Sequence, residues 1–282
     1  MSETPLIGPA ELAALGAEDR LRVVDCRFVL SDPDAGRRAY ATGHLPGAVY
    51  AHLDNDLAGP VTPRSGRHPL PDPGHFAAVL GAWDIRPDTL VVAYDDASGA
   101  LASRLWWLLG WVGHGPRRVL DGGIDAWLAA GLPLTTAEPS PPRAPAYPVQ
   151  PDPERVAGTD AVIEALAAGI PVLDARARDR FLGRQEPIDP VAGHIPGSLN
   201  QPFSANLDED GRFLPAAELA ARLARLGVGE GGSAVALCGS GVTACHTILA
   251  AAVAGLPEPR LYPGSWSEWI RDPDRPVATG PD

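Results

Sequence analysis

The segment best suited to chemistry is a glycine-rich loop that begins at Cys238 and reads Cys-Gly-Ser-Gly-Val-Thr. It follows an apolar stretch typical of a buried strand and precedes a helical pattern at 244–254. Its glycines permit a tight turn whose backbone N–H groups point inward, with a helix N-terminus behind them. Such a loop binds anions and stabilises a thiolate. We therefore predict that Cys238 is a nucleophile. The alternative, a buried structural cysteine, is disfavoured by the glycine-rich position between strand and helix.

Short apolar runs alternate with helical patterns along the chain. Apolar runs predict buried strands at 21–24, 90–94, 172–173 and 234–237, and their nearly continuous apolar character is typical of a parallel sheet covered on both faces. Amphipathic patterns predict helices at 11–15, 75–82, 102–109, 160–167 and 216–226. This alternation predicts an α/β fold, in which ligands bind beyond the carboxyl ends of the strands, where Cys238 lies.

Four sequence blocks occur twice in the same order. The matched blocks are 23–27 with 172–176, 43–48 with 193–198, 90–95 with 233–238, and 119–127 with 261–269. The offsets, 142 to 150 residues, are too long for a solenoid repeat, so they indicate two copies of one domain. We expect an N-terminal domain at 1–137, a Pro-rich linker at 138–150 and a C-terminal domain at 151–282.

Composition excludes several classes of partner. The 282 residues carry 35 acidic and 23 basic side chains, all of the latter arginine, for a net charge of −12. Such a surface repels nucleic-acid phosphates and anionic lipid, and no apolar run approaches the roughly 20 residues that span a bilayer. The N-terminus lacks the pattern of a secretory signal, and three distant cysteines make no disulfide framework. We expect a cytoplasmic protein with no nucleic-acid or membrane partner.

Other chemistry at the cysteine loop is disfavoured. Cys245 and His246 follow Cys238 by seven and eight residues, which puts them ~10 Å away along a helix axis, too far to share a metal ion. The chain lacks the G-x-S-x-G motif of serine hydrolases. Ala244 stands where a Cys-x5-Arg phosphatase loop has its arginine. We therefore expect neither a metal nor an organic cofactor.

The chain resembles the tandem-domain rhodanese-type sulfurtransferases over nearly its whole length. The resemblance rests on the paired Gly-His-(Leu/Ile)-Pro-Gly segments, on the closing segments at 121–123 and 262–266, and on the cysteine loop. The loop is similar to that of the 3-mercaptopyruvate branch, whereas thiosulfate-preferring members carry basic residues where this chain has Gly239 and Ser240. The resemblance implies two domains, each a parallel sheet flanked by helices, with chemistry in the second. Asp95 occupies the cysteine position of the first, and a carboxylate cannot accept sulfane sulfur.

The resemblance also implies which residues accompany Cys238. Arg180 matches the arginine that binds the donor, and a guanidinium suits a carboxylate. Some relatives have a second arginine about nine residues later; this chain has none there, and Arg184 is the alternative. His68 lies in Arg67-His68-Pro69-Leu70-Pro71, which resembles the family's His-Met-Leu-Pro segment.

A proton relay completes the expected site. Asp54 stands at the place of the family's aspartate, with Asp56 as an alternative. Asp54, His68 and Ser240 would form a set spanning the two domains, because the donor arrives with an S–H and pyruvate leaves needing a proton.

These residues together predict sulfur transfer by a covalent intermediate. Cys238 would attack the sulfur of 3-mercaptopyruvate, release pyruvate and pass the persulfide sulfur to a small thiol, thioredoxin or cyanide. The small anionic donor would be held by Arg180 and by the loop residues Gly239, Gly241, Val242 and Thr243. Two alternatives remain: a thiosulfate:cyanide sulfurtransferase, and a non-enzymatic persulfide carrier that serves a partner protein.

Overall fold

The computed structural model, which describes residues 4–16, 20–139, 144–229 and 234–281, divides into two units. Unit 1 comprises residues 1–59, 71–152 and 210–212, and unit 2 comprises residues 60–70, 153–209 and 213–282. The segment 60–70, which carries Arg67 and His68, therefore belongs to unit 2 although it precedes most of unit 1 in the sequence.

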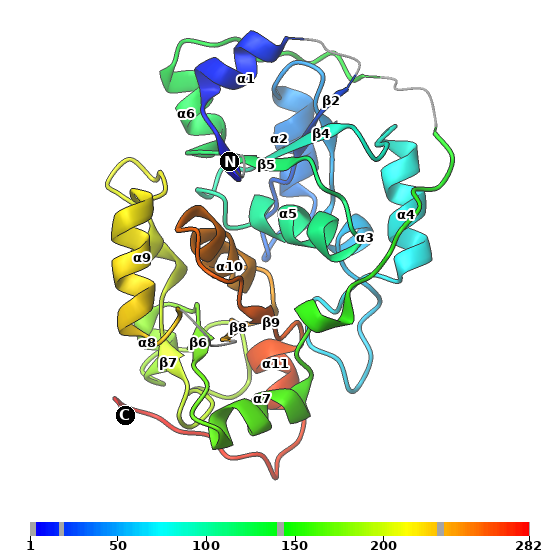
Figure 1. The fold of residues 1–282 in the computed structure, drawn as a ribbon. Helices are drawn as coiled ribbons and strands as arrows, with labels where there is room; N and C mark the ends of the chain where they lie inside the picture. The colour runs from blue at the N-terminus through cyan, green and yellow to red at the C-terminus, as the bar shows by residue number, and fades with distance from the viewer. Residues whose placement is uncertain (1–3, 17–19, 140–143, 230–233, 282) are drawn as a thin grey trace. The chain divides into compact units, whose positions relative to one another are not determined.

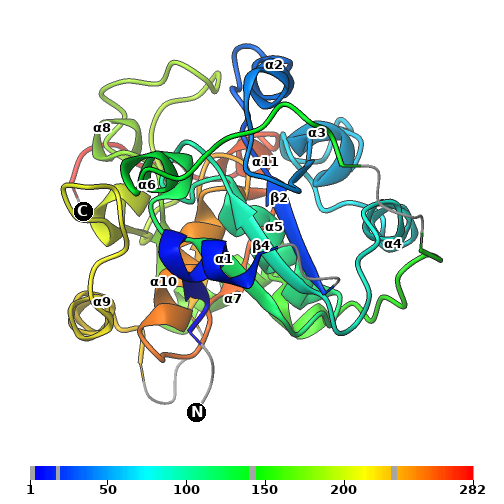
Figure 2. The same ribbon diagram turned by 90° about the horizontal axis from the view of Figure 1, so that it is seen from above.

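Unit 1 contains a five-stranded parallel sheet in the order β1-β5-β4-β2-β3. The strands are β1 (Leu6–Ile7), β2 (Leu21–Asp25), β3 (Val49–Tyr50), β4 (Leu90–Tyr94) and β5 (Arg117–Leu120). The helices are α1 (Pro9–Leu15), α2 (Ala35–Thr42), α3 (Leu53–Asp56), α4 (Pro73–Ala82), α5 (Ala102–Trp111) and α6 (Gly123–Ala129). β2 and β4 pair along their full length and lie side by side (Figure 1; Figure 2).

Unit 2 contains a four-stranded parallel sheet in the order β7-β6-β8-β9. The strands are β6 (Val172–Asp174), β7 (Leu199–Asn200), β8 (Val235–Leu237) and β9 (Arg260–Leu261). The α-helices are α7 (Thr159–Ala167), α8 (Arg178–Phe181), α9 (Ala216–Arg225), α10 (Ala244–Val253) and α11 (Ser265–Trp269), and the short 3-10 helices are η1 (Pro153–Arg155) and η2 (Phe203–Asn206). β8 leads through the cysteine loop into α10 (Figure 1).

The predicted α/β class with a parallel sheet in each half is confirmed. The longest apolar runs became the central strands β2, β4, β6 and β8, whose last residues are fully or almost fully buried. Four strands of two residues each, β1, β3, β7 and β9, were not predicted. Two residues are too short to show a periodicity.

The two cores use equivalent residues of the repeated blocks. Val92, Tyr94 and Trp127 are buried in unit 1, and Val235 and Trp269 are buried in unit 2. Each of the two tryptophans also donates its indole N–H to a proline carbonyl, with N···O distances of 2.9 Å. The fourth repeated block, 119–127 in unit 1 and 261–269 in unit 2, therefore closes each core in the same way.

The Pro-rich segment predicted as a linker lies partly outside the described residues, which omit 140–143. Its following part runs along unit 1, where the amides of Ala144 and Tyr147 donate to the carbonyls of Gly81 and Ala77 at 3.0 Å. The boundaries of this linker stay a prediction. Among the described residues, helices are too short or too polar to cross a membrane.

Candidate functional site

The cysteine loop surrounds the sulfur of Cys238 with backbone amides. Cys238 directly follows β8, is 2% exposed, and accepts the N–H of Gly241 and of Ser240 on its Sγ at 3.1 and 3.5 Å. Gly241 has a φ of +75°, and a Cβ there would lie 2.5 Å from the Pro263 carbonyl oxygen. Only glycine fits this turn, and the turn aims two N–H groups at the sulfur, where they stabilise negative charge.

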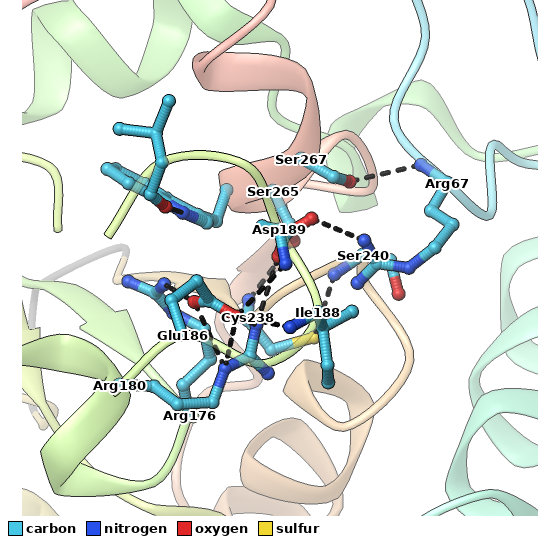
Figure 3. A network of polar contacts seen from close by, with 12 residues as sticks. Arg67, Arg176, Arg180, Glu186, Ile188, Asp189, Cys238, Ser240, Ser265 and Ser267 are labelled. Atoms are coloured by element: carbon cyan, nitrogen blue, oxygen red, sulfur yellow. Dashed lines mark hydrogen bonds and ion pairs between the residues drawn. The ribbon is translucent and has the colours of Figure 1, made fainter. Parts of the chain in front are cut away.

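The block at 262–267 holds the cysteine loop by hydrogen bonds. The Cys238 N–H donates to Ser265 Oγ at 3.1 Å (Figure 3). The carbonyls of Cys238 and Gly239 accept the N–H groups of Trp266 and Ser267 at 3.0 and 2.9 Å. Ser265 itself has a positive φ of 54°, a strained conformation for a residue with a side chain. The amides around the sulfur are therefore held in place before any substrate arrives.

Ser240 and His68 are in hydrogen-bond contact within unit 2. The distance from Ser240 Oγ to His68 Nδ1 is 2.7 Å, and the two residues are 6% and 4% exposed. The segment 60–70 that carries His68 packs closely on the second repeat, since a Cβ on Gly66 would lie 2.3 Å from the Gly264 carbonyl oxygen. The structure thus brings together two members of the predicted relay next to Cys238.

Asp54 and its alternative Asp56 belong to α3 of unit 1. Asp54 is exposed, and its backbone N–H donates to His52 Nδ1 at 3.1 Å. Asp56 is partly buried and accepts the His52 N–H at 2.7 Å, and burial raises its pKa in spite of this bond. Because His68 and Ser240 lie in the other unit, the role of either aspartate in the relay stays a prediction.

Arg180 is held by two buried carboxylates. Its Nε donates to both carboxylate oxygens of Glu186 at 3.0 and 3.1 Å, and its Nη2 donates to Asp189 Oδ2 at 3.0 Å (Figure 3). The side chains of Glu186 and Asp189 are 4% and 3% exposed. Arg180 is therefore part of an ordered network beside the cysteine loop and not a solvated surface arginine.

The pKa of Glu186 reflects this network. Burial alone would raise it, but the hydrogen bonds from Arg180 and from the amides of Asp189 and Ile188 outweigh burial and hold the pKa below its ordinary value. Arg184, named above as an alternative second arginine, pairs instead with Asp179 at 3.4 Å, and both side chains are more than half exposed.

Sequence reasoning missed Arg67, Glu186 and Asp189 as members of the site. Arg67 forms an ion pair with Asp189, and its backbone N–H donates to Ser267 Oγ at 3.0 Å. Only its position next to His68 could have drawn attention to Arg67. Glu186 and Asp189 occur in a segment that, in the sequence, is typical of an exposed acidic loop.

Unit 1 shows what the same loop does when its first residue is an aspartate. Asp95 directly follows β4, is fully buried, and accepts four backbone N–H groups at 2.7 to 2.9 Å. The donors are Ala97, Gly99, Leu101 and Ala102. The loop of the first copy is thus an anion cradle filled by the chain's own carboxylate.

Other residues repeated in the two copies have structural partners. Each strand β2 and β6 ends on an aspartate that pairs with the arginine two residues later, and that arginine also donates to a glycine carbonyl at 2.8 Å. His44 and His194 stack on Tyr40 and Phe181, with ring centroids 3.9 and 3.7 Å apart. Their occurrence in both copies assigns them to the fold.

The other two cysteines lie in different surroundings. Burial, reinforced by nearby Asp95 and Asp25, raises the pKa of Cys26 well above its ordinary value. Cys245 is fully buried in α10, 3.4 Å from the Gly241 carbonyl oxygen that its thiol faces. All three cysteines are free of disulfides. Among the described residues, groups of three side chains able to hold a metal ion do not occur.

Comparison with known proteins gives consistent matches over the chain. The model of the rhodanese-like domain matches twice, at residues 8–130 and 159–272. A relative from Pseudomonas aeruginosa named as a probable 3-mercaptopyruvate sulfurtransferase is 51% identical, over 99% of this chain and 100% of its own. The thiosulfate sulfurtransferase of Rattus norvegicus is 36% identical, over 92% of this chain and 89% of its own.

A solved structure agrees with the fold. The 3-mercaptopyruvate sulfurtransferase from Leishmania major is 34% identical and superimposes with a TM-score of 0.82, covering 94% of this chain and 73% of its own. Relatives named for each of the two donors therefore match nearly the whole chain, and the choice between donors has to be argued from the site.

Proposed function

The chain belongs to the rhodanese-like family, and from this premise we propose that it takes the sulfur of 3-mercaptopyruvate onto Cys238 and passes it to a thiophilic acceptor. The observation that carries the proposal is the pair of amides, from Ser240 and Gly241, directed at the Cys238 sulfur. They stabilise the attacking thiolate and then the persulfide, so one arrangement serves both halves of a ping-pong reaction.

The bond changes define what the neighbouring residues must do. The Cys238 thiolate attacks the donor sulfur, the new S–S bond forms, and the C–S bond breaks with its electron pair moving to the enolate of pyruvate. The proton of the donor S–H has to leave the sulfur, and the methylene carbon has to gain one. Ser240, bonded to His68 at 2.7 Å, relays this proton, a role typically worth about 10²–10⁴-fold in rate.

The charges around the loop favour a donor with a single negative charge. Three guanidinium groups and three carboxylates lie in this network among the described residues: Arg67, Arg176 and Arg180 with Asp174, Glu186 and Asp189. Their formal charges cancel, so the side chains offer a dianion such as thiosulfate no surplus positive charge. 3-Mercaptopyruvate carries a single carboxylate and therefore requires less positive charge in its binding site.

The acceptor is a small thiol, thioredoxin or cyanide, and the protein works in the cytoplasm. Three cysteines outside any disulfide fit a reducing compartment, and the net charge of −12 disfavours nucleic acid and anionic membranes as partners. No organic cofactor or metal enters the reaction as proposed.

Steady-state kinetics with both donors tests this function. Purified protein is supplied with 3-mercaptopyruvate or thiosulfate and with cyanide as the common acceptor, and thiocyanate formation is followed. We expect the larger kcat/KM with 3-mercaptopyruvate. A larger value with thiosulfate would establish the alternative donor, and slow turnover with both donors but fast transfer to one partner protein would establish a persulfide carrier.

A further inference from the structure

We infer that Arg67 is a donor-binding residue, and that it holds the donor carboxylate together with Arg180 in the space above Gly239. This inference rests on the proposed function and adds a specificity residue from a distant segment of the chain. Figure 3 shows the two arginines approaching the cysteine loop from opposite sides, with Asp189 between them.

Only part of the Arg67 guanidinium has a protein partner among the described residues. Its Nη1 is paired with Asp189. Its Nε is buried without a hydrogen-bond partner in the described part of the chain, and its Nη2 donates to none of the described residues. The side chain is 25% exposed. A guanidinium offers Nε and Nη2 as one edge that matches the two oxygens of a carboxylate. On Arg67 this edge has no protein partner among the described residues, and Nη2 is the nitrogen that faces Gly239.

Arg180 shows the opposite pattern. Its Nε and Nη2 already bind Glu186 and Asp189, so its bidentate edge is filled by the protein. Within the described residues, its Nη1 makes no hydrogen bond and no ion pair. Arg180 can therefore give an incoming anion its Nη1, and Arg67 can give it the Nη2 that faces Gly239.

Gly239 shows that the open nitrogens face one small space. A Cβ on Gly239 would lie 3.1 Å from Nη2 of Arg67 and 3.6 Å from Nη1 of Arg180. Both distances are measured to the same point, which lies over the residue that follows Cys238. Glycine has no side chain to fill this point, and an anion placed there is next to the nucleophile.

Asp189 aligns the two arginines. Its Oδ1 pairs with Arg67 and its Oδ2 accepts from Arg180 at 3.0 Å, and its side chain is 3% exposed. A buried carboxylate that bridges two guanidiniums fixes their separation and keeps them from repelling each other. Arg67 is fixed further by its backbone bond to Ser267, so the same ordered segment delivers the clamp and the neighbouring His68.

The test compares donors with and without a carboxylate. Arg67→Met is assayed by single-turnover persulfide formation with 3-mercaptopyruvate and with mercaptoacetone, in which a methyl group replaces the carboxylate. We expect the 3-mercaptopyruvate concentration for half-maximal rate to rise about 10- to 100-fold, as for loss of a charge-assisted hydrogen bond. The maximal rate and the reaction with mercaptoacetone should change little.

Control variants separate binding from folding. Arg64→Met removes an exposed arginine from the same segment and should behave as wild type. Arg67→Lys keeps the charge but not the two-nitrogen edge and should recover part of the affinity. If wild type reacts too slowly with mercaptoacetone, the inhibition constant of pyruvate, which keeps the carboxylate, is compared instead and should rise in Arg67→Met.

Three results would overturn the inference. An unchanged concentration dependence in Arg67→Met would show that Arg67 does not bind the donor. Equal losses with both donors, or an unchanged inhibition constant for pyruvate, would assign Arg67 to positioning His68 or to the fold. Failure of wild type to form a persulfide from 3-mercaptopyruvate would instead refute the proposed function, which makes the two failures distinguishable.

Discussion

Replacing Arg180 by alanine removes the partner of two buried carboxylates and a donor contact in one step. Deleting one member of a buried ion pair costs about 3–5 kcal/mol of unfolding free energy. After the change Glu186 keeps Arg176 at 3.6 Å, and Asp189 keeps Arg67. We therefore expect the lower end of the range, about 3 kcal/mol, measured as the loss of unfolding free energy in urea.

The loss of unfolding free energy in Arg180→Ala should depend on pH, because the ionisation of Glu186 contributes to it. A carboxyl whose pKa is lowered in the folded state stabilises the fold above its unfolded pKa, and this contribution disappears as the pH falls through the folded pKa. The pKa of Glu186 is lowered. The difference in stability between wild type and Arg180→Ala should thus be largest near neutral pH and should shrink below about pH 4.

A double variant separates the structural role of Arg180 from its role in binding. Arg180→Ala/Glu186→Gln also removes the charge of Glu186, which has lost its partner Arg180, and should recover part of the lost stability. It should not recover the KM for 3-mercaptopyruvate, which we expect to rise about 10- to 100-fold in both variants. Pyruvate release gives the kinetics. Full recovery of KM in the double variant would show that Arg180 only holds the acidic loop and does not bind the donor.

Three further changes have expected outcomes of different kinds. Ser240→Ala should lower kcat with 3-mercaptopyruvate by about 10²-fold or more and hardly affect thiosulfate turnover, since thiosulfate has no S–H; equal losses with both donors would exclude the relay. Gly239→Ala should raise KM for 3-mercaptopyruvate about tenfold without lowering the melting temperature, because its methyl group would enter the space 3.1 Å from Nη2 of Arg67; an unchanged KM would place the carboxylate elsewhere. Asp95→Ala leaves four buried amides without their acceptor and should lower the unfolding free energy by about 3 kcal/mol or more; an unchanged urea midpoint would contradict the cradle.

The fold was predictable where the sequence pattern is local. β4 and β8 are continuous apolar runs between turn residues, and the cysteine loop stands between an apolar run and a helical pattern, so both could be found by inspection. β7 and β9 have two residues each and depend on pairing with β6 and β8 for their existence. Tertiary pairing of this kind leaves no mark in a short window.

The site was predictable only in part, for a related reason. The glycine-rich loop at Cys238 has a local signature, and the resemblance supplied His68, Ser240 and Arg180. The contact of Arg67 with Asp189 joins residues 122 positions apart, and neither residue type is unusual at the surface of an acidic protein. Such a pair becomes recognisable only when folding buries the carboxylate and leaves the Nη2 of the guanidinium facing Gly239.

The position of the transferred sulfur tests the proposed mechanism directly. The protein is incubated with 3-mercaptopyruvate in the absence of an acceptor, digested without reductant and analysed by mass spectrometry. We predict one added sulfur atom on the peptide that contains Cys238, its loss on addition of cyanide, and its absence in Cys238→Ser. Added sulfur chiefly on Cys26 or Cys245, or persulfide formation that persists in Cys238→Ser, would show that Cys238 is not the sulfur acceptor.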